Sequence, residues 1–240
     1  MRLHRFIGNF DLAKKQINIT DKDFLNQAKN VLRFKVGDKI VLCDGNVNEA
    51  AAEIINLDNK IAELKILEIY KNESEPKNHV TLYCPILKKE NFEIAVQKAV
   101  EVGVKEIIPV ITKRTVKLGL SHARLNKIIK EAAEQSDRGI LPKLREAVSF
   151  DEAVEQAKAN DLNYFFNTGN NMGPVAITSK TSDRLKCAQC KIGVFVGPEG
   201  GWDEAEIKKA QSHGFAMAGL GKLTLRAETA VIIASYVVAC

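Results

Sequence analysis

Residues 192–201 read IGVFVGPEGG, and the fold predicted for the chain rests on this segment. The run Ile192 to Val196 is short, continuous and rich in β-branched residues, which predicts a buried strand. Three glycines around Pro198 cannot continue that strand. They expose backbone N–H groups and let a ligand approach the backbone closely. The sequence therefore predicts a buried strand that ends in a ligand-accessible loop.

The segment after this loop repeats the same plan. Asp203 and Glu206 have the spacing of a capping box, which predicts a helix that ends near His213. A second strand, residues 215–220, then leads into a polar, glycine-bearing loop and the apolar run 230–240. Ligands of open α/β sheets bind at the carboxyl ends of the strands, where both loops would lie. The alternative is an ordinary α/β half with functionless turns.

Strands and helices alternate from His79 onward, which predicts an α/β domain over residues 73–240. Its sheet would be parallel, with helices on both faces. The predicted strands are residues 80–86, 106–111 and 163–167, and the predicted helices are residues 88–102, 124–136 and 150–157.

Residues 1–72 have a different pattern of short β-like runs with turn signals between them. The runs 39–43, 53–57 and 61–69 predict strands, and Asp44-Gly45 is a hairpin signal. One helix, residues 21–32 with Thr20 as its N-cap, interrupts them. This pattern favours a small, mainly antiparallel β-barrel. A polar stretch, residues 71–78, then forms the predicted linker.

Composition excludes several classes of protein. Hydrophobic residues make up 45% of the 240-residue chain and charged residues 27%, which is typical of a globular protein and not of a disordered one. No apolar run is long enough to span a bilayer, and the N-terminus lacks the apolar core of an export signal, so we expect a cytoplasmic location. The net charge of +5 permits a nucleic-acid partner without requiring one.

Five cysteines without an export signal are expected to be free thiols. Cys187 and Cys190 form a C-x-x-C pair, but no second Cys/His pair has zinc-ligand spacing. We therefore expect no metal site.

Five motifs carry a resemblance to a known family. They are Val31-Leu32-Arg33, residues 97–104 (QKAVEVGV), residues 131–136 (EAAEQS), residues 197–201 (GPEGG) and residues 225–230 (LRAETA). Together they extend over nearly the whole chain, which resembles the ribosomal RNA small subunit methyltransferase E family. This family belongs to the SPOUT class and methylates N3 of a uridine in 16S rRNA.

The resemblance implies a PUA-like RNA-binding barrel in residues 1–72 and a SPOUT domain with a deep trefoil knot in residues 73–240. It also implies a homodimer that binds S-adenosylmethionine (SAM) in the knot loops. Three places depart from the family pattern: Gln27 replaces a histidine, residues 113–115 read KRT in place of Glu-Arg-Ser, and residues 167–171 lack the usual Pro or Glu.

The resemblance, together with the glycine content of the loops, predicts which residues contact the cofactor. Glycines would allow close backbone approach, and leucines would enclose the adenine ring. The candidates are Asn167, Thr168, Gly197, Pro198, Glu199, Gly200, Gly201, Leu220, Gly221, Leu225, Arg226, Ala227 and Thr229.

Arg226, Glu228 and Glu199 are the candidates for catalysis. Loss of the N3 proton spreads negative charge onto the two uridine carbonyls, and an arginine can stabilise that charge. Either carboxylate could accept the proton. Alternatively, Arg226 pairs with one of these carboxylates and braces the loops, and the carboxylates cap backbone N–H groups.

Basic residues of both domains are candidates for RNA binding, since phosphate contacts position RNA without reading its sequence. The alternative is a solvated basic face. Two rival functions also remain, a ribose 2′-O methyltransferase and a non-catalytic RNA-binding protein, and the latter would not bind SAM. The candidate RNA contacts are Arg2, Arg5, Arg33, Lys35, Arg114 and Arg138.

Overall fold

The computed structural model describes residues 3–115, 119–167 and 189–239. The chain divides into two compact units, Met1–Glu75 with Ala133–Leu141, and Pro76–Ala132 with Pro142–Cys240. The sequence predicts a domain boundary at residue 72, and the chain first passes from one unit to the other at Glu75–Pro76. The sequence does not predict that the segment after the helix at 122–135 returns to the first unit.

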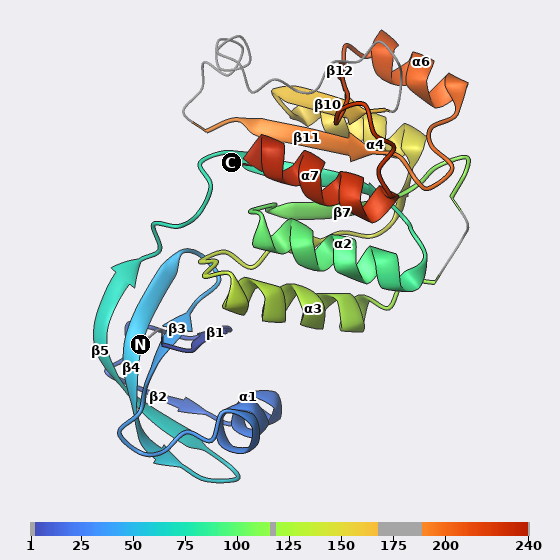
Figure 1. The fold of residues 1–240 in the computed structure, drawn as a ribbon. Helices are drawn as coiled ribbons and strands as arrows, with labels where there is room; N and C mark the ends of the chain where they lie inside the picture. Colours follow the sequence, from blue (N-terminus) through green and yellow to red (C-terminus); the bar gives the residue numbers. More distant parts are fainter. Residues whose placement is uncertain (1–2, 116–118, 168–188, 240) are drawn as a thin grey trace. The chain divides into compact units, whose positions relative to one another are not determined.

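The first unit contains a five-stranded sheet in the order β1-β3-β4-β5-β2 (Figure 1). Three of its pairings are antiparallel, as expected for the barrel: β2 with β5, β3 with β4, and β4 with β5. The short strand β1 was not predicted, and it pairs parallel with β3. The strands are β1 (Arg5–Ile7), β2 (Gln16–Ile19), β3 (Lys39–Cys43), β4 (Asn48–Leu57) and β5 (Ala62–Lys71).

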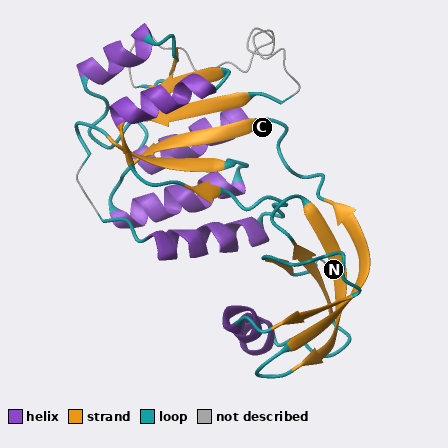
Figure 2. Cartoon of the chain, turned by 180° about the vertical axis from the view of Figure 1, so that it is seen from behind, coloured by secondary structure: helices purple, strands orange, loops and turns teal. Residues whose placement is uncertain are grey.

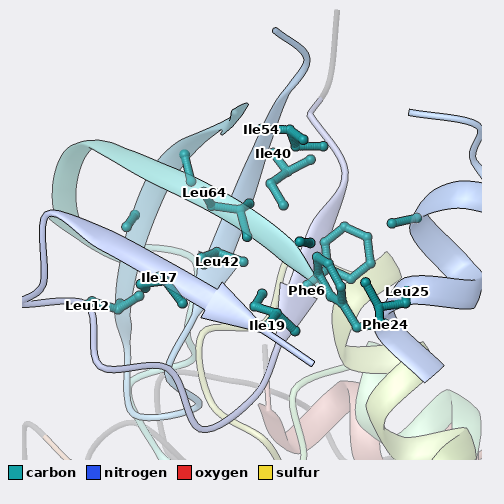
Figure 3. Close-up of a cluster of buried hydrophobic side chains, with 14 residues drawn as sticks. Phe6, Leu12, Ile17, Ile19, Phe24, Leu25, Ile40, Leu42, Ile54 and Leu64 are labelled. Carbon is teal, nitrogen blue, oxygen red and sulfur yellow. The ribbon is translucent and has the colours of Figure 1, made fainter. Parts of the chain in front are cut away.

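Helix α1 (Lys22–Asn26) packs its aromatic residue into the core of this sheet. The rings of Phe24 and Phe6 lie 4.6 Å apart, among aliphatic side chains from the strands (Figure 3). The predicted N-cap, Thr20, is wrong by one residue, because the Asp21 carboxylate accepts the Phe24 N–H. The helix is also shorter than predicted, since it continues as a π-helical turn, Gln27–Val31.

The second unit is built on a seven-stranded parallel sheet in the order β12-β10-β11-β6-β7-β8, with β9 also paired to β7. This confirms the predicted α/β domain. Strand β11 lies at its centre, and five of its six residues are buried, which explains its unbroken apolar sequence. The strands are β6 (His79–Pro85), β7 (Glu106–Ile111), β8 (Lys143–Leu144), β9 (Val148–Ser149), β10 (Leu162–Phe166), β11 (Lys191–Val196) and β12 (Ala216–Ala218).

Helices cover both faces of this sheet (Figures 1 and 2). Helices α2 and α7 pack against each other on one face, and α7 also contacts β6 and β11. Helix α4 packs on β7 and shares an aromatic cluster with α6. The helices are α2 (Lys89–Glu101), α3 (His122–Gln135), α4 (Phe150–Gln156), α6 (Glu204–Ser212) and α7 (Ala227–Ala239), with a 3₁₀ turn at Ala157–Ala159.

The helix after the glycine loop forms as its sequence predicts. Asp203 caps α6, and the reciprocal hydrogen bonds between Asp203 and Glu206 complete the capping box. Gly214 follows the helix with a φ of +74°, a conformation that glycine adopts without strain. Helix α7 begins at Ala227, three residues before the apolar run that starts at residue 230.

No helix in the described ranges is both long and apolar enough to cross a membrane. The expectation of free thiols holds for the buried residues Cys43 and Cys84. It is wrong for Cys190, which is disulfide-bonded.

Candidate active site

Three neighbouring strands of the second unit end at the same level. Phe166, the last residue of β10, is in register with Val196 at the end of β11 and with Ala218 at the end of β12. The backbone N–H of Asn167 donates to the Ala218 carbonyl at 3.0 Å. The two glycine loops, which follow β11 and β12, therefore begin at the same edge of the sheet, as predicted.

The GPEGG loop, residues 197–201, folds into a tight turn. The Gly201 N–H donates to the Pro198 carbonyl at 2.8 Å, and Gly201 has a φ of +70°. In the described chain no atom lies within 4 Å of the position that a Cβ of Gly201 would occupy. The turn is thus compact, with open space beside its last residue.

Trp202 packs against the first residue of this loop. Its side chain is 5% exposed, and its indole N–H donates to the carbonyl of Phe166 at 2.8 Å. Its ring stacks on Phe165 at 4.4 Å. A Cβ on Gly197 would lie 3.1 Å from the indole nitrogen, so a side chain there would press on the ring. No motif in the sequence predicts this role for the tryptophan.

Glu199 is exposed, and one of its carboxylate oxygens lies 3.4 Å from the backbone N of Lys88. Lys88 occupies the N-cap position of α2 without a side-chain cap of its own. A carboxylate near a helix N-terminus is stabilised by the unpaired N–H groups there. The geometry therefore favours the capping alternative for Glu199, and its catalytic role stays a prediction.

The loop from Gly219 to Arg226 lies between β12 and α7 and carries several partly exposed apolar side chains. Leu220 and Leu225 are half-buried, and Leu223 is 80% exposed. Gly221 has a φ of +110°, and within the described residues nothing lies within 4 Å of where its Cβ would be. Exposed apolar side chains around an open glycine are suited to contact a flat, partly apolar ligand.

Arg226 is exposed, and its backbone carbonyl accepts the Ala230 N–H at the start of α7. Across the described ranges its guanidinium forms no hydrogen bond or ion pair. The alternative in which Arg226 braces the loop by pairing with Glu199 or Glu228 is therefore not seen. Ala227 is buried in the first turn of α7, and Thr229 is half-buried.

Glu228 lies in the first turn of α7 and is half-buried. Its Oε2 is buried, and among the described residues it has no hydrogen-bond partner. A buried carboxylate oxygen without a donor is costly, so we expect a bound group or water to satisfy it. This oxygen is available to accept a proton or a hydrogen bond from a ligand.

Arg114 is the predicted RNA contact that belongs to the second unit, and it lies in the turn after β7. Its side chain is exposed, and Nη1 donates to the Gly200 carbonyl at 2.8 Å. Arg114 therefore contacts the GPEGG loop directly, which the sequence did not predict.

Two of the predicted RNA contacts in the first unit are engaged inside the protein. Arg138 has a side chain that is 4% exposed and donates from Nε and Nη2 to the two oxygens of Glu75. Arg5 is 11% exposed and forms an ion pair with Glu49, which is itself buried. Both guanidinium groups are largely buried in ion pairs within the first unit, and a role in RNA binding stays a prediction for them.

Arg33 and Lys35 differ from these two because both are exposed. Arg33 has a φ of +57°, a conformation that costs free energy for a side-chain-bearing residue. The exposed valines Val31 and Val36 flank the pair. The remaining candidates, Arg2 and Thr168, lie outside the described residues.

Glu206 was predicted only as a helix cap, but the structure gives it a second contact. Its Oε1 accepts the backbone N–H of Lys113, far away in the sequence, at 2.9 Å. No sequence signal distinguishes this carboxylate from an ordinary capping residue. The described part of the chain contains no cluster of His, Cys, Asp or Glu suited to hold a metal.

Two family models match the chain. The model of an RNA methyltransferase domain matches residues 73–239, and the model of an RNA methyltransferase PUA domain matches residues 28–67. The first match alone extends over more than half of the chain.

Named relatives extend the same finding. Ribosomal RNA small subunit methyltransferase E of Mesomycoplasma hyopneumoniae is 36% identical over 175 residues, which are 70% of this chain and 72% of the relative. The Rickettsia conorii protein of the same name is 29% identical over 98% of this chain and 94% of its own length.

A crystal structure of ribosomal RNA small subunit methyltransferase E from Neisseria gonorrhoeae, bound to SAM, superposes with a TM-score of 0.87. It is 28% identical, and the match covers 98% of this chain and 96% of that one. The fold is thus the SPOUT fold with an N-terminal barrel-like domain. The chain belongs to the ribosomal RNA small subunit methyltransferase E family.

Proposed function

We propose that this protein transfers a methyl group from SAM to N3 of a uridine in the 16S rRNA of the small ribosomal subunit. Its membership of the family supports SAM-dependent methylation of small-subunit ribosomal RNA. The observation that carries the proposal is the common level at which β10, β11 and β12 end, with Arg226 and Glu228 in the segment that follows β12.

The residues at this edge fit the cofactor. Gly201 and Gly221 leave open space beside the backbone, where an adenosine could approach it closely. Half-buried Leu220 and Leu225 offer apolar surface for a ring. A methyltransferase from Legionella pneumophila, 26% identical with a TM-score of 0.85 over 99% of this chain, was solved in complex with SAM.

When bound, SAM supplies an activated methyl group on a sulfonium centre. The protein must orient the uridine and stabilise the charge that develops when N3 loses its proton. Arg226 is suited to this task, because its guanidinium is exposed at the loop and has no partner among the described residues. Its planar set of N–H donors matches a carbonyl oxygen that gains negative charge.

Glu228 is the better of the two carboxylates for accepting the N3 proton. Its Oε2 is buried and, in the described chain, lacks a donor, whereas Glu199 contacts the N-terminus of α2. A base must lie within hydrogen-bond reach of the proton that it removes, directly or through one water. Glu228 lies in the first turn of α7, two residues after Arg226.

The first unit would hold the RNA through Arg33 and Lys35, whose exposed charges can contact phosphates. A homodimer would cover the outer face of α7, where Ile233 and Tyr236 are 37% and 57% exposed. Exposed apolar residues on one helix face favour association. A ribosomal substrate also favours a cytoplasmic location.

The decisive test identifies the methylated atom. Small ribosomal subunits that lack the modification are incubated with the protein and SAM, and the RNA is digested to nucleosides for mass spectrometry. We expect 3-methyluridine, which blocks base pairing and stops reverse transcriptase. A 2′-O-methylated nucleoside would support the ribose enzyme instead, and no SAM binding by calorimetry would leave only an RNA-binding protein.

A further inference from the structure

The turn Thr112–Thr115, which follows β7, contacts the GPEGG loop although β6 separates β7 from β11 in the sheet. The turn has internal hydrogen bonds: Thr115 N–H donates to the Thr112 carbonyl at 3.1 Å, and the two hydroxyls lie 2.7 Å apart. It therefore has a defined shape of its own and can act as a support for a neighbouring segment.

Two contacts join this turn to the start of α6. The backbone N–H of Lys113 donates to Glu206 Oε1 at 2.9 Å, and the other oxygen of Glu206 accepts the Asp203 N–H at 2.9 Å. Glu206 is 7% exposed, so one buried carboxylate holds both backbone segments. The Lys113 ammonium adds an ion pair to Asp203 at 3.1 Å.

A third contact acts on the glycine loop itself. The peptide group between Gly200 and Gly201 is held on both sides: its carbonyl accepts from Arg114 at 2.8 Å, and its N–H donates to Pro198 at 2.8 Å. A peptide between two glycines has more rotational freedom than any other, because neither residue has a Cβ. Arg114 restricts that freedom at the point where the backbone would meet the cofactor.

We propose that Arg114 is a positioning residue for the cofactor loop, with Glu206 and Lys113 anchoring the turn that carries it. This inference rests on the proposed function, because the loop it positions is the proposed SAM site. It assigns to Arg114 a role beyond the RNA contact that its charge suggests. Ordering the loop before the cofactor binds avoids part of the entropy cost of binding.

The first experiment measures the loop without cofactor or RNA. Amide hydrogen exchange of residues 197–206 is compared in the wild-type protein, in Arg114→Ala and in Arg124→Ala. Arg124 is an exposed arginine of the same unit that pairs with Glu93, so its variant matches the change in charge. We expect at least about tenfold faster exchange in Arg114→Ala alone, the size expected for losing one hydrogen bond to a charged group.

The second experiment titrates SAM into the same proteins by calorimetry, with RNA absent. We expect Kd for SAM to rise about tenfold in Arg114→Ala, to recover partly in Arg114→Lys, and to be unchanged in Arg124→Ala. In turnover assays KM for SAM should rise more than kcat falls. Glu206→Gln, which keeps one acceptor oxygen, should give a smaller change in the same direction.

The outcomes separate this inference from the proposed function. If the wild-type protein does not bind SAM, the proposed function fails, whatever the exchange data show. If the wild-type protein binds SAM but Arg114→Ala has wild-type exchange and a Kd within about twofold of the wild-type value, the positioning role is overturned. In that case, a loss of RNA affinity in Arg114→Ala would indicate that Arg114 contacts an RNA phosphate and does not position the loop.

Discussion

The sequence predicts substrate contacts for both Arg138 in the first unit and Arg226 in the second, but only Arg226 is exposed. Arg138 is enclosed with Glu75, which also accepts the N–H groups of Gly139 and Ile140. Arg226 extends from a glycine loop with no partner among the described residues. Pairing with a buried carboxylate thus holds Arg138 inside the protein, where its guanidinium is not exposed to a ligand.

The difference has an energetic cause. A buried charge is tolerated only when it is paired and its hydrogen-bonding groups are satisfied. A buried arginine therefore keeps its ion pair with the carboxylate and does not exchange it for a ligand. An exposed arginine keeps its hydration and can exchange water for a ligand. The same residue type therefore serves stability in one unit and, we propose, chemistry in the other.

The largest expected effect is on the first unit. Arg138→Ala leaves the Glu75 carboxylate buried without its charged partner, and we expect the free energy of unfolding to fall by about 3–5 kcal/mol. Urea unfolding measures this loss. Arg33→Ala, an exposed arginine of the same unit, is the matched control and should change stability by less than about 0.5 kcal/mol. Equal stability of the two variants would contradict the stabilising role that we assign to the Arg138–Glu75 ion pair.

Arg226→Ala tests the second unit with the opposite expectation. We expect the rate of methyl transfer to fall by about 10²–10³-fold, because a donor to the developing charge is lost. The urea midpoint should stay within error of the wild-type value, and SAM should still bind in calorimetry. A loss of SAM binding of the same size would show that Arg226 supports the loop and not the substrate.

Trp202→Phe tests a neutral hydrogen bond within the second unit, because it keeps an aromatic ring on Phe165 but removes the indole N–H together with part of the ring. The Phe166 carbonyl then loses its donor, so we expect a loss of about 1–2 kcal/mol in the free energy of unfolding. Kd for SAM should also rise, since this hydrogen bond joins the end of β10 to the residue that follows the GPEGG loop. An unchanged Kd would mean that the loop keeps its conformation without the Trp202–Phe166 hydrogen bond.

The smallest effect is expected for the exposed pair Arg124–Glu93. The hydrogen bond from Arg124 lowers the pKa of Glu93 from its ordinary value of 4.5. A carboxyl with a lowered pKa in the folded state contributes stability above its unfolded pKa, and the contribution disappears as pH falls through the folded pKa. Arg124→Ala should therefore lower the thermal midpoint slightly at neutral pH, and high salt or acid should remove the difference. A difference that persists in acid would contradict this assignment.

Much of the fold could be predicted because it depends on local patterns. The strands β3 and β7 lie where their apolar runs predict, and the Asp203 capping box forms because its hydrogen bonds join residues three apart. Strand β1 was missed because three residues give too short a pattern, and it exists through pairing with β3. The knot and the homodimer stay predictions drawn from the family.

The α/β domain, the glycine loops at the strand ends and the family could all be predicted from the sequence, since these depend on residue type and short spacing. Which charged residues are exposed depends on the three-dimensional packing. Arg138 and Glu75 are 63 positions apart, and Arg114 and Gly200 are 86 positions apart, so nothing local records either contact. The role of an arginine here follows from burial and from its partner, and both are set by how distant segments pack.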